Sequence, residues 1–278
     1  MKSISILLGT SLLFSTGSLK AQTNLEKIWS SDTVLKVPES VLYSKEGSVL
    51  YIANIDGQPA EKDGKGSIGK VGLDGKVIQA EWVTGLNAPK GMAISGNSLW
   101  VADVDRMVEI DIKAGSIKRT VAIDGSEFLN DVTATPDGKI FVSDSKGKKV
   151  YQLTNGSPAL YLENLKGPNG LLFHAGSLYV LDNGSLLKAG DNKQTQIIAQ
   201  GMDGSTDGIE AVKGNDFIVS CWTGVIYYVH ADGKTEQLLD TREQKVNSAD
   251  IGYDQANRIV YVPTFFKNNV VAYKLNVK

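Results

Sequence analysis

Short apolar strands separated by polar turns recur along the chain at an even spacing. Each copy begins with a polar position and an apolar pair, continues through a turn, and ends in a strand of aliphatic and aromatic residues. The six copies begin at Pro38-Glu39-Ser40-Val41, Pro89-Lys90-Gly91-Met92, Leu129-Asn130-Asp131-Val132, Pro168-Asn169-Gly170-Leu171, Thr206-Asp207-Gly208-Ile209 and Ser248-Ala249-Asp250-Ile251. A period of about 40 residues with several strands per unit is typical of a propeller blade. The pattern predicts an all-β protein, a six-bladed β-propeller.

Further strands are expected between the copies, for example at residues 149–153 and 159–162. Turn dipeptides such as Asp74-Gly75 and Asp232-Gly233 separate strands as hairpins require. No amphipathic helix is indicated after residue 24. An open sandwich of irregular sheets is the alternative architecture, but it does not account for the even spacing.

The two ends of the chain indicate how the ring closes. The sixth unit stops after its third strand, residues 270–275, whereas residues 26–29 form a strand-like piece that belongs to no unit. We therefore predict that an N-terminal strand completes the last blade. Such closure removes exposed strand edges, which otherwise favour aggregation.

The first 21 residues have the features of an export leader. Lys2 precedes a short apolar run at residues 4–14, and Leu19-Lys20-Ala21 offers small residues for cleavage. The run is shorter than the roughly 20 apolar residues of a membrane span and is typical of a secretory signal peptide. We predict a signal peptide at 1–21 and a single propeller domain at 22–278, exported to the periplasm or secreted.

Charge and cysteine content exclude several classes of partner. The chain has 29 basic and 31 acidic residues, and loss of Lys2 and Lys20 with the leader makes the net charge −4. This balance gives no electrostatic footprint for nucleic acid or for a membrane surface. Cys221 is the only cysteine, so no internal disulfide can form. The oligomeric state is left open.

One position of the repeat indicates a metal site. The first strand of each propeller blade lines the central channel, so the residue that precedes it lies at the channel mouth. The aligned positions hold Glu39, Lys90, Asn130, Asn169, Asp207 and Ala249. Four of these are oxygen donors, which suit calcium or magnesium rather than zinc; calcium is the expected ion, and magnesium and zinc stay as alternatives. Each residue type is also common in turns, so the prediction rests on their shared position.

Four short motifs, in this order and at this spacing, resemble those of a known family. They are Pro38-Glu39-Ser40, Phe128-Leu129-Asn130-Asp131, Gly167-Pro168-Asn169-Gly170-Leu171 and Thr206-Asp207-Gly208-Ile209. The family is that of regucalcin and gluconolactonase, also called senescence marker proteins, with diisopropyl fluorophosphatase as a more distant likeness. The resemblance spans the chain after the leader. It implies a six-bladed propeller whose channel metal is held by Glu39, Asn130, Asn169 and Asp207.

The oxygen cluster and the resemblance together predict a divalent-metal-dependent hydrolase that acts on a lactone or similar ester. Its substrate is expected to be a small molecule, a lactone or a sugar derivative. Asp207 is the first choice of general base, and Asp131 and Asp250 are candidates for handling protons. Lys90 is expected to orient the substrate or stabilise an oxyanion, or else to pair with Glu39 or Asp131.

An alternative function is a non-catalytic propeller that binds a ligand or a protein partner, with calcium only stabilising the blades. Family lactonases often carry an arginine at the position of Phe128, so the family's substrate is not carried over. Trp222, Phe265 and Phe266 either wall an apolar side of the pocket or pack within their loops.

Several other features are not expected to form sites. Residues 64–70 match most of a phosphate-binding loop, but Val71 follows where a hydroxyl should hold magnesium. His174 and His230 are expected in turns on the face opposite the metal residues, so a general base should be a carboxylate or a metal-bound water. Cys221 has no activating partner and is expected to be a small buried group.

Overall fold

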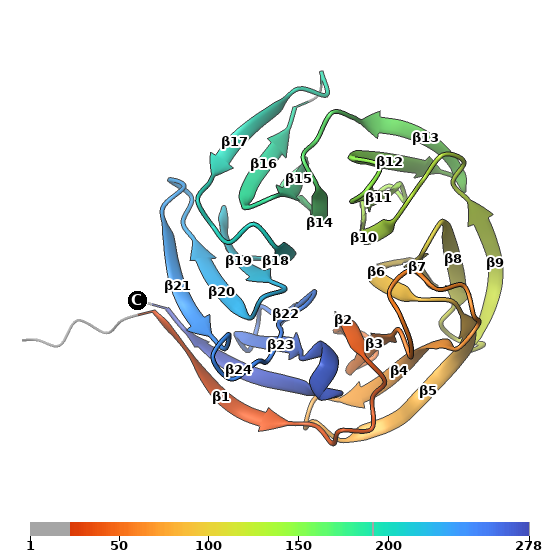
Figure 1. Ribbon diagram of the computed structural model, residues 1–278, viewed down its shortest axis with the longest axis horizontal. Helices are drawn as coiled ribbons and strands as arrows, with labels where there is room; N and C mark the ends of the chain where they lie inside the picture. The colour runs from red at the N-terminus through yellow and green to blue at the C-terminus, as the bar shows by residue number, and fades with distance from the viewer. Residues whose placement is uncertain (1–22, 191, 278) are drawn as a thin grey trace, which may run out of the picture.

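Antiparallel strands make up nearly all of the structure, and strands that are consecutive in the sequence are neighbours within each sheet. This computed structural model describes residues 23–190 and 192–277, and the predicted signal peptide lies outside them. The strands form six four-stranded sheets arranged as blades around a channel (Figure 1), as predicted. Within the described ranges the helical structure consists of η1 (Phe265–Lys267), a single 3-10 turn. None of the described helical segments has the length and apolar character needed to cross a bilayer.

The strands of each blade are ordered from the channel outward. The first five blades are β2 (Pro38–Ser44), β3 (Val49–Asn54), β4 (Gly66–Gly72) and β5 (Val77–Leu86); β6 (Pro89–Ser95), β7 (Ser98–Asp103), β8 (Arg106–Asp111) and β9 (Ser116–Ala122); β10 (Leu129–Ala134), β11 (Ile140–Asp144), β12 (Lys149–Thr154) and β13 (Ser157–Leu162); β14 (Pro168–His174), β15 (Ser177–Asp182), β16 (Ser185–Ala189) and β17 (Thr195–Ala199); and β18 (Thr206–Lys213), β19 (Asp216–Cys221), β20 (Val225–Val229) and β21 (Thr235–Asp240). The sixth blade contains β22 (Gly252–Asp254), β23 (Ile259–Pro263), β24 (Val270–Asn276) and β1 (Asn24–Ser30).

Burial of the strands depends on their place within a blade. Second strands such as β3 and β11 are buried at every residue, because both of their faces pack against neighbouring blades. The outermost strand β9 is exposed at nearly every residue. Full burial on both faces explains why second strands are continuous apolar runs such as Val49-Leu50-Tyr51-Ile52 rather than alternating patterns.

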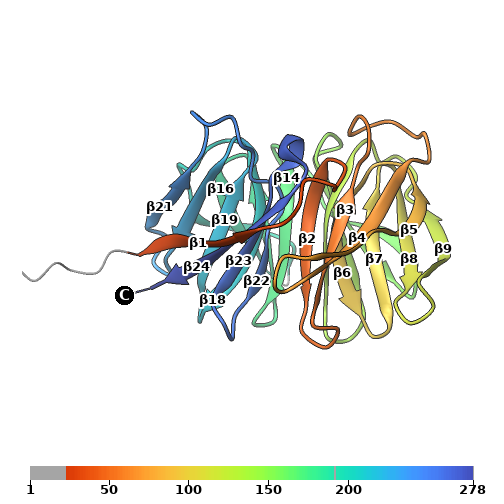
Figure 2. The same ribbon diagram turned by 90° about the horizontal axis from the view of Figure 1, so that it is seen from below.

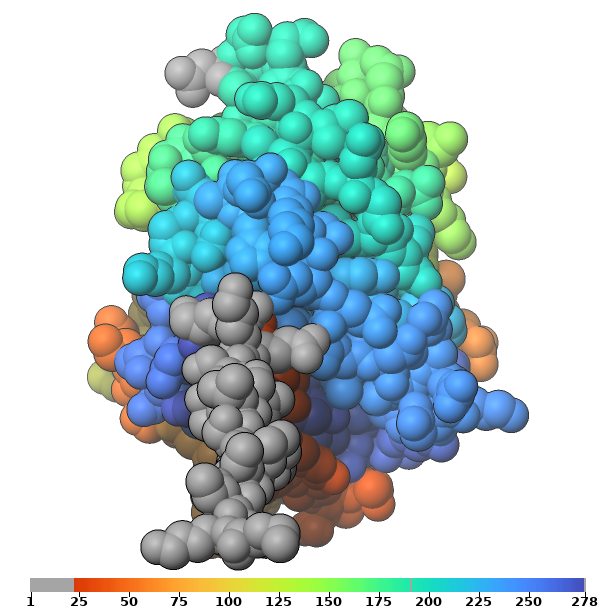
Figure 3. All heavy atoms as spheres, turned by 90° about the vertical axis from the view of Figure 1, so that its left-hand side faces the viewer, coloured from red at the N-terminus to blue at the C-terminus, as the bar shows by residue number. Residues whose placement is uncertain are grey.

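The apolar core is divided among clusters that lie between adjacent blades. One cluster joins Tyr51 and Ile68 of blade one to Met92 and Val101 of blade two. Another cluster packs Tyr261 of blade six against blade one. At the surface, Figure 3 shows blades four and five in close side-by-side contact. Because apolar contacts are made between the blades, the inner strands can carry polar side chains at the axis.

The two ends of the chain meet in the sixth blade, which confirms the predicted closure. β1 pairs antiparallel with β24, with Leu25 opposite Leu275 and Ser30 opposite Val271. Figure 2 shows β1 lying across the outside of this blade, beside β24. The pairing covers the edge that β24 would otherwise expose.

The inner strand of the sixth blade is shorter than its repeat copy predicted. β22 has three residues, and it begins after the copy at residues 248–251. Asp250 instead exchanges backbone hydrogen bonds with blade one: its N–H donates to the Glu39 carbonyl at 2.9 Å, and the Val41 N–H donates to the Asp250 carbonyl at 3.0 Å. This contact ties the last inner strand to the first and closes the ring a second time.

Candidate functional site

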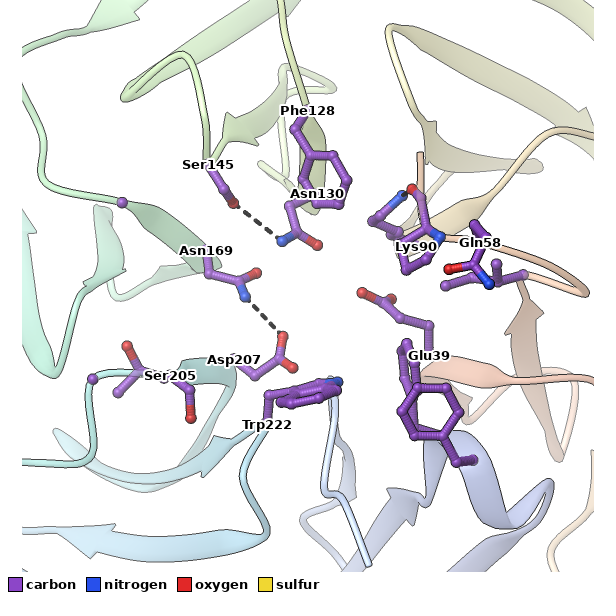
Figure 4. A pocket seen from close by; sticks show the side chains of 17 residues that line it. Glu39, Gln58, Lys90, Phe128, Asn130, Ser145, Asn169, Ser205, Asp207 and Trp222 are labelled. Atoms are coloured by element: carbon purple, nitrogen blue, oxygen red, sulfur yellow. Dashed lines mark hydrogen bonds between the residues drawn. The ribbon is translucent and has the colours of Figure 1, made fainter. Parts of the chain in front are cut away.

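A cavity of about 520 Å³ opens at the end of the channel where the inner strands of the first five blades begin. The predicted oxygen donors and the lysine of blade two all line it, namely Glu39 from β2, Lys90 from β6, Asn130 from β10, Asn169 from β14 and Asp207 from β18. Figure 4 shows the side chains of the four oxygen donors converging on the middle of this pocket. The structure therefore brings together residues that are widely separated in the sequence.

The backbone is irregular at each of these five residues. The pairing register between the first and second strands of a blade shifts at Glu39, Lys90, Asn130, Asn169 and Asp207 alike. A bulge of this kind leaves residues outside the regular ladder and redirects their side chains. Its repetition in five blades explains why one position of the repeat points into the channel mouth each time.

Glycines that follow some of these residues let the inner strands approach one another closely. A Cβ on Gly170 would lie 2.3 Å from the Asp207 carbonyl oxygen, and a Cβ on Gly91 would lie 2.2 Å from Asp131 Oδ1. Only glycine lacks the atom that would collide there. Because the strands are so close, the Asn169 side chain reaches Asp207, with Nδ2 donating to Oδ1 at 2.9 Å.

Buried aspartates at the ends of second strands hold the loops that lead into the site. Asp144 accepts a hydrogen bond from the Phe128 N–H at 2.8 Å, and Asp182 accepts one from the Gly167 N–H at 2.7 Å. Each bonded N–H lies two residues before a site asparagine, and Asp103 has the same role in blade two. The sequence-based prediction missed these residues, although an aspartate ending three successive second strands is a visible repeat.

Hydrogen bonds determine which way the two site amides face. Ser145 Oγ donates to the Pro168 carbonyl at 2.6 Å and accepts from Asn130 Nδ2 at 3.1 Å. The Nδ2 group of Asn169 is turned toward Asp207. Both amide oxygens are therefore directed into the pocket (Figure 4).

Two oxygen atoms of the site are buried without a hydrogen-bond partner, Glu39 Oε2 and Asn169 Oδ1. An unpartnered buried oxygen is costly, and a bound cation removes that cost. The donors therefore fit a hard divalent ion such as calcium, which binds carboxylate and amide oxygens. Among the described residues, no three His, Cys, Asp or Glu side chains form a metal-binding group. A metal in this pocket would thus depend on the amides of Asn130 and Asn169 as well as on the carboxylates.

The electrostatics of the channel also favour a cation. Burial raises the pKa of Glu39 well above its usual range, and nearby Asp207 adds to the rise while Lys90 opposes it. The pKa of Asp207 is raised by burial and by Asp250, whose own pKa burial raises to about 7. Ionised carboxylates at these positions repel one another in a poorly solvated space. A divalent cation between them would relieve that repulsion.

Lys90 is buried, and its hydrogen bonds go to backbone carbonyls rather than to Glu39 or Asp131, the partners suggested by the sequence. Its Nζ donates to the Pro59 carbonyl at 2.8 Å and to a second carbonyl at 2.9 Å. It also lies 4.5 Å from the centre of the Phe128 ring. Burial lowers the pKa of Lys90 to about 8. The lysine therefore holds the loop between β3 and β4 against the pocket.

Asp131 lines a different space from the four oxygen donors. This second cavity, of about 270 Å³, is lined by residues that lie further along the inner strands. Glu210 and Asp250 are among its lining residues. The Asp131 carboxylate accepts hydrogen bonds from the N–H groups of Val132 and Leu171, both at 2.6 Å. Asp131 is thus close to the axis but does not line the pocket of the oxygen donors.

The features not expected to form sites have no part in the pocket. His174 ends β14 and so lies at the other end of that strand, while His230 Nε2 lies 3.0 Å from Glu236 Oε1. Cys221 is buried, and burial raises the pKa of its thiol. Residues 64–70 run into β4 rather than into a helix.

The ring of blades and the polar pocket at its mouth define the protein as a six-bladed β-propeller with a candidate ligand site on the channel axis. No family model and no curated protein matches the chain. Solved structures that are similar to it over most of their length include the following three. A gluconolactonase from Xanthomonas campestris is 18% identical, with 90% of this chain and 87% of that chain covered and a TM-score of 0.65.

A virginiamycin B lyase from Staphylococcus aureus is 14% identical, with 92% of this chain and 100% of that chain covered and a TM-score of 0.64. A chain of the nidogen/laminin complex is 18% identical, with 78% of this chain and 84% of that chain covered and a TM-score of 0.64. At these identities the likeness shows a shared propeller fold.

Proposed function

We propose that the protein is a divalent-metal-dependent hydrolase of lactones or similar esters, with calcium as the preferred ion and magnesium or zinc as alternatives. The observation that carries the proposal is the pair of buried, unpartnered oxygens, Glu39 Oε2 and Asn169 Oδ1, in a pocket that Asn130 and Asp207 also line. The fold shared with a gluconolactonase supports a small-molecule substrate such as a lactone or sugar derivative.

The chemistry needs an electrophile and a base. When bound, a divalent ion would polarise the substrate carbonyl and lower the pKa of water. Asp207 presents one oxygen to the pocket while Asn169 Nδ2 holds the other, so its carboxylate can accept a proton from the attacking water. Water adds to the carbonyl carbon, the carbon–oxygen bond of the ester breaks, and the departing oxygen takes up the proton. The product of a lactone is a hydroxy acid.

Two substitutions test the proposal. Asn169→Ala and Asp207→Ala should abolish calcium-dependent hydrolysis across a lactone panel and reduce the shift in melting temperature produced by calcium. Asn97→Ala, an exposed substitution in the turn between β6 and β7, is the matched control and should behave as the wild type. Full lactonase activity in a folded Asn169→Ala or Asp207→Ala protein would refute the assignment.

The competing function is a calcium-stabilised propeller that binds a ligand or protein without catalysis. A chain of the nidogen/laminin complex shares the fold. Stabilisation by calcium without turnover of any lactone, phosphotriester or sugar ester would favour this function. We also propose an exported location, periplasmic or secreted, on the leader-like pattern of residues 1–21.

A further inference from the structure

The pocket has a side that is chemically unlike its oxygen donors. Trp222, directly after β19, and Phe265 and Phe266, in η1, line it on the side of blades five and six; we call these three residues the aromatic wall. Trp222 is 39% exposed and Phe266 is 63% exposed. Large aromatic surfaces left open inside a concave pocket are typical of a ligand-binding site. Figure 4 shows the Trp222 ring beside Asp207.

Ring contacts and backbone hydrogen bonds hold the aromatic wall in place. Its rings contact one another edge to face, with centroids 5.7 Å apart for Trp222 and Phe265 and 4.7 Å apart for Phe265 and Phe266. The backbone of Trp222 is held on both sides, since its N–H donates to the Ser205 carbonyl at 2.8 Å and its carbonyl accepts from Asn247 at 2.8 Å. Phe265 has a φ of 50°, a strained conformation for a bulky residue that persists only where its surroundings enforce it.

The hydroxyl side chains of the pocket are already committed to other partners. Ser145 Oγ donates to the Pro168 carbonyl at 2.6 Å, and Ser205 Oγ donates to Asp203 at 2.7 Å. Thr206 Oγ1 accepts from a backbone N–H at 3.2 Å. A polyhydroxylated substrate would therefore find few free partners among the hydroxyl side chains of the pocket. Unpaired polar groups weaken binding when they are desolvated.

Phe128 extends the apolar character to the side of blade three. Its ring lies under two ammonium groups, with Nζ of Lys90 at 4.5 Å and Nζ of Lys146 at 4.9 Å from its centre. Lys90 is further held by the Pro59 carbonyl. Aromatic side chains thus border the oxygen donors on two sides of the cavity. Within the part of the chain that the structure describes, the side formed by the aromatic wall is the one without an ammonium group among its ring contacts.

We propose that the substrate is a lactone or ester with an alkyl or aryl substituent, and that the aromatic wall binds this substituent while the carbonyl group faces the oxygen donors. This inference rests on the proposed function. Hydrolysis follows the same balance: water adds to the carbonyl carbon, the ring carbon–oxygen bond breaks, and a substituted hydroxy acid is released. Trp222 and Phe266 are the residues that determine specificity, because they expose the most aromatic surface.

Three δ-lactones with related rings test the inference with calcium present: δ-decalactone, δ-valerolactone and gluconolactone. We expect kcat/KM for δ-decalactone to exceed that for each of the others by about tenfold or more, since several methylene groups become buried. Trp222→Ala and Phe266→Ala should each lower the ratio of kcat/KM for δ-decalactone to that for δ-valerolactone by about tenfold. The control is Ile78→Ala, since Ile78 is also 63% exposed but lies on the outer strand β5, and the ratio should not change.

A binding measurement separates failure of this inference from failure of the proposed function. The lactam of δ-decalactone resists hydrolysis, and it should quench or shift tryptophan fluorescence in the wild type but not in Trp222→Phe. A preference for gluconolactone, or a ratio unaffected by both aromatic substitutions, would overturn the inference while leaving a lactonase in place. If no lactone is hydrolysed, the proposed function fails, and an unchanged fluorescence on adding the lactam would overturn the aromatic wall as a binding surface as well.

Discussion

Replacing Asp250 with asparagine tests whether the channel carboxylates cost the protein stability. Asp250 is buried at the axis, where its Oδ2 accepts a hydrogen bond from Ser40 Oγ at 2.5 Å. Asparagine keeps the shape and an acceptor oxygen but cannot ionise. Burial raises the pKa of Asp250 from its ordinary 3.8 to about 7. Between these pH values the folded protein retains a proton that the unfolded chain has released.

The direction and size of the effect follow from this difference in protonation. The contribution of Asp250 to the free energy of unfolding is fully present below pH 3.8. It falls by about 1.4 kcal/mol per pH unit as the pH rises toward 7. The loss amounts to about 4 kcal/mol above pH 7, and relaxation around the charge reduces it. We expect Asp250→Asn to be more stable than the wild type by about 2–4 kcal/mol at pH 7.5 and equally stable at pH 3.5.

Urea unfolding in EDTA at pH 3.5, 5.5 and 7.5 measures this difference. Asp124→Asn, in an exposed turn, is the matched control and should leave the free energy of unfolding within about 0.5 kcal/mol at each pH. An Asp250→Asn protein that is no more stable than the wild type at pH 7.5, or whose advantage does not grow with pH, would contradict the reasoning.

Three further perturbations test how the site and the ring are built. Gly170→Ala places a Cβ 2.3 Å from the Asp207 carbonyl oxygen and should lower the free energy of unfolding by about 1–3 kcal/mol, whereas Gly167→Ala, with no atom within 4 Å, should be neutral in the same urea titration. Ser145→Ala removes the oxygen that orients Asn130 and should weaken calcium binding by about 10- to 100-fold in calorimetry; an unchanged affinity would refute that role. Deleting β1 exposes the edge of β24 and should cause association on size-exclusion chromatography, and a stable monomer would contradict the closure.

The fold was predictable because every blade meets the same packing requirement with the same local pattern. A second strand buried on both faces is mostly apolar, so its recurrence shows the period directly. Closure followed from a last unit with three strands and a spare strand at residues 26–29. The short length of β22 was not predictable from the sequence, because Asp250 bonds to blade one instead of to its own blade. Its partner Ser40 is 210 positions away along the chain.

The repeat predicted that Glu39, Asn130, Asn169 and Asp207 lie at one channel mouth, but it did not predict their surroundings or the separate position of Asp131. The shared repeat position identified Asn130 and its counterparts, and prolines and glycines beside several of them agree with the bulges found there. The hydroxyl of Ser145 orients the Asn130 amide because it donates its own proton to the Pro168 carbonyl of the next blade. The sequence around Ser145 does not indicate this contact. Lys90 was expected to act on the substrate or else to pair with Glu39 or Asp131, but its nitrogen donates to the Pro59 carbonyl in a loop that belongs to no repeat.

One copy of the repeat lacks the polar residue that the other five carry, and this difference makes one side of the pocket apolar. The sixth copy carries Ala249 where the other five carry polar side chains, and Ala249 is fully buried in an apolar cluster with Phe265. β22 pairs with β23 only from Gly252 onward, and the alanine at position 249 offers no polar side chain to the mouth from this blade. A ring with six polar members would surround a ligand evenly. Because one sector is apolar and carries two rings of the aromatic wall, a bound ester can place its carbonyl toward Asn169 and Asp207 and its substituent toward blade six. The reverse orientation would leave its polar oxygen against aromatic carbon.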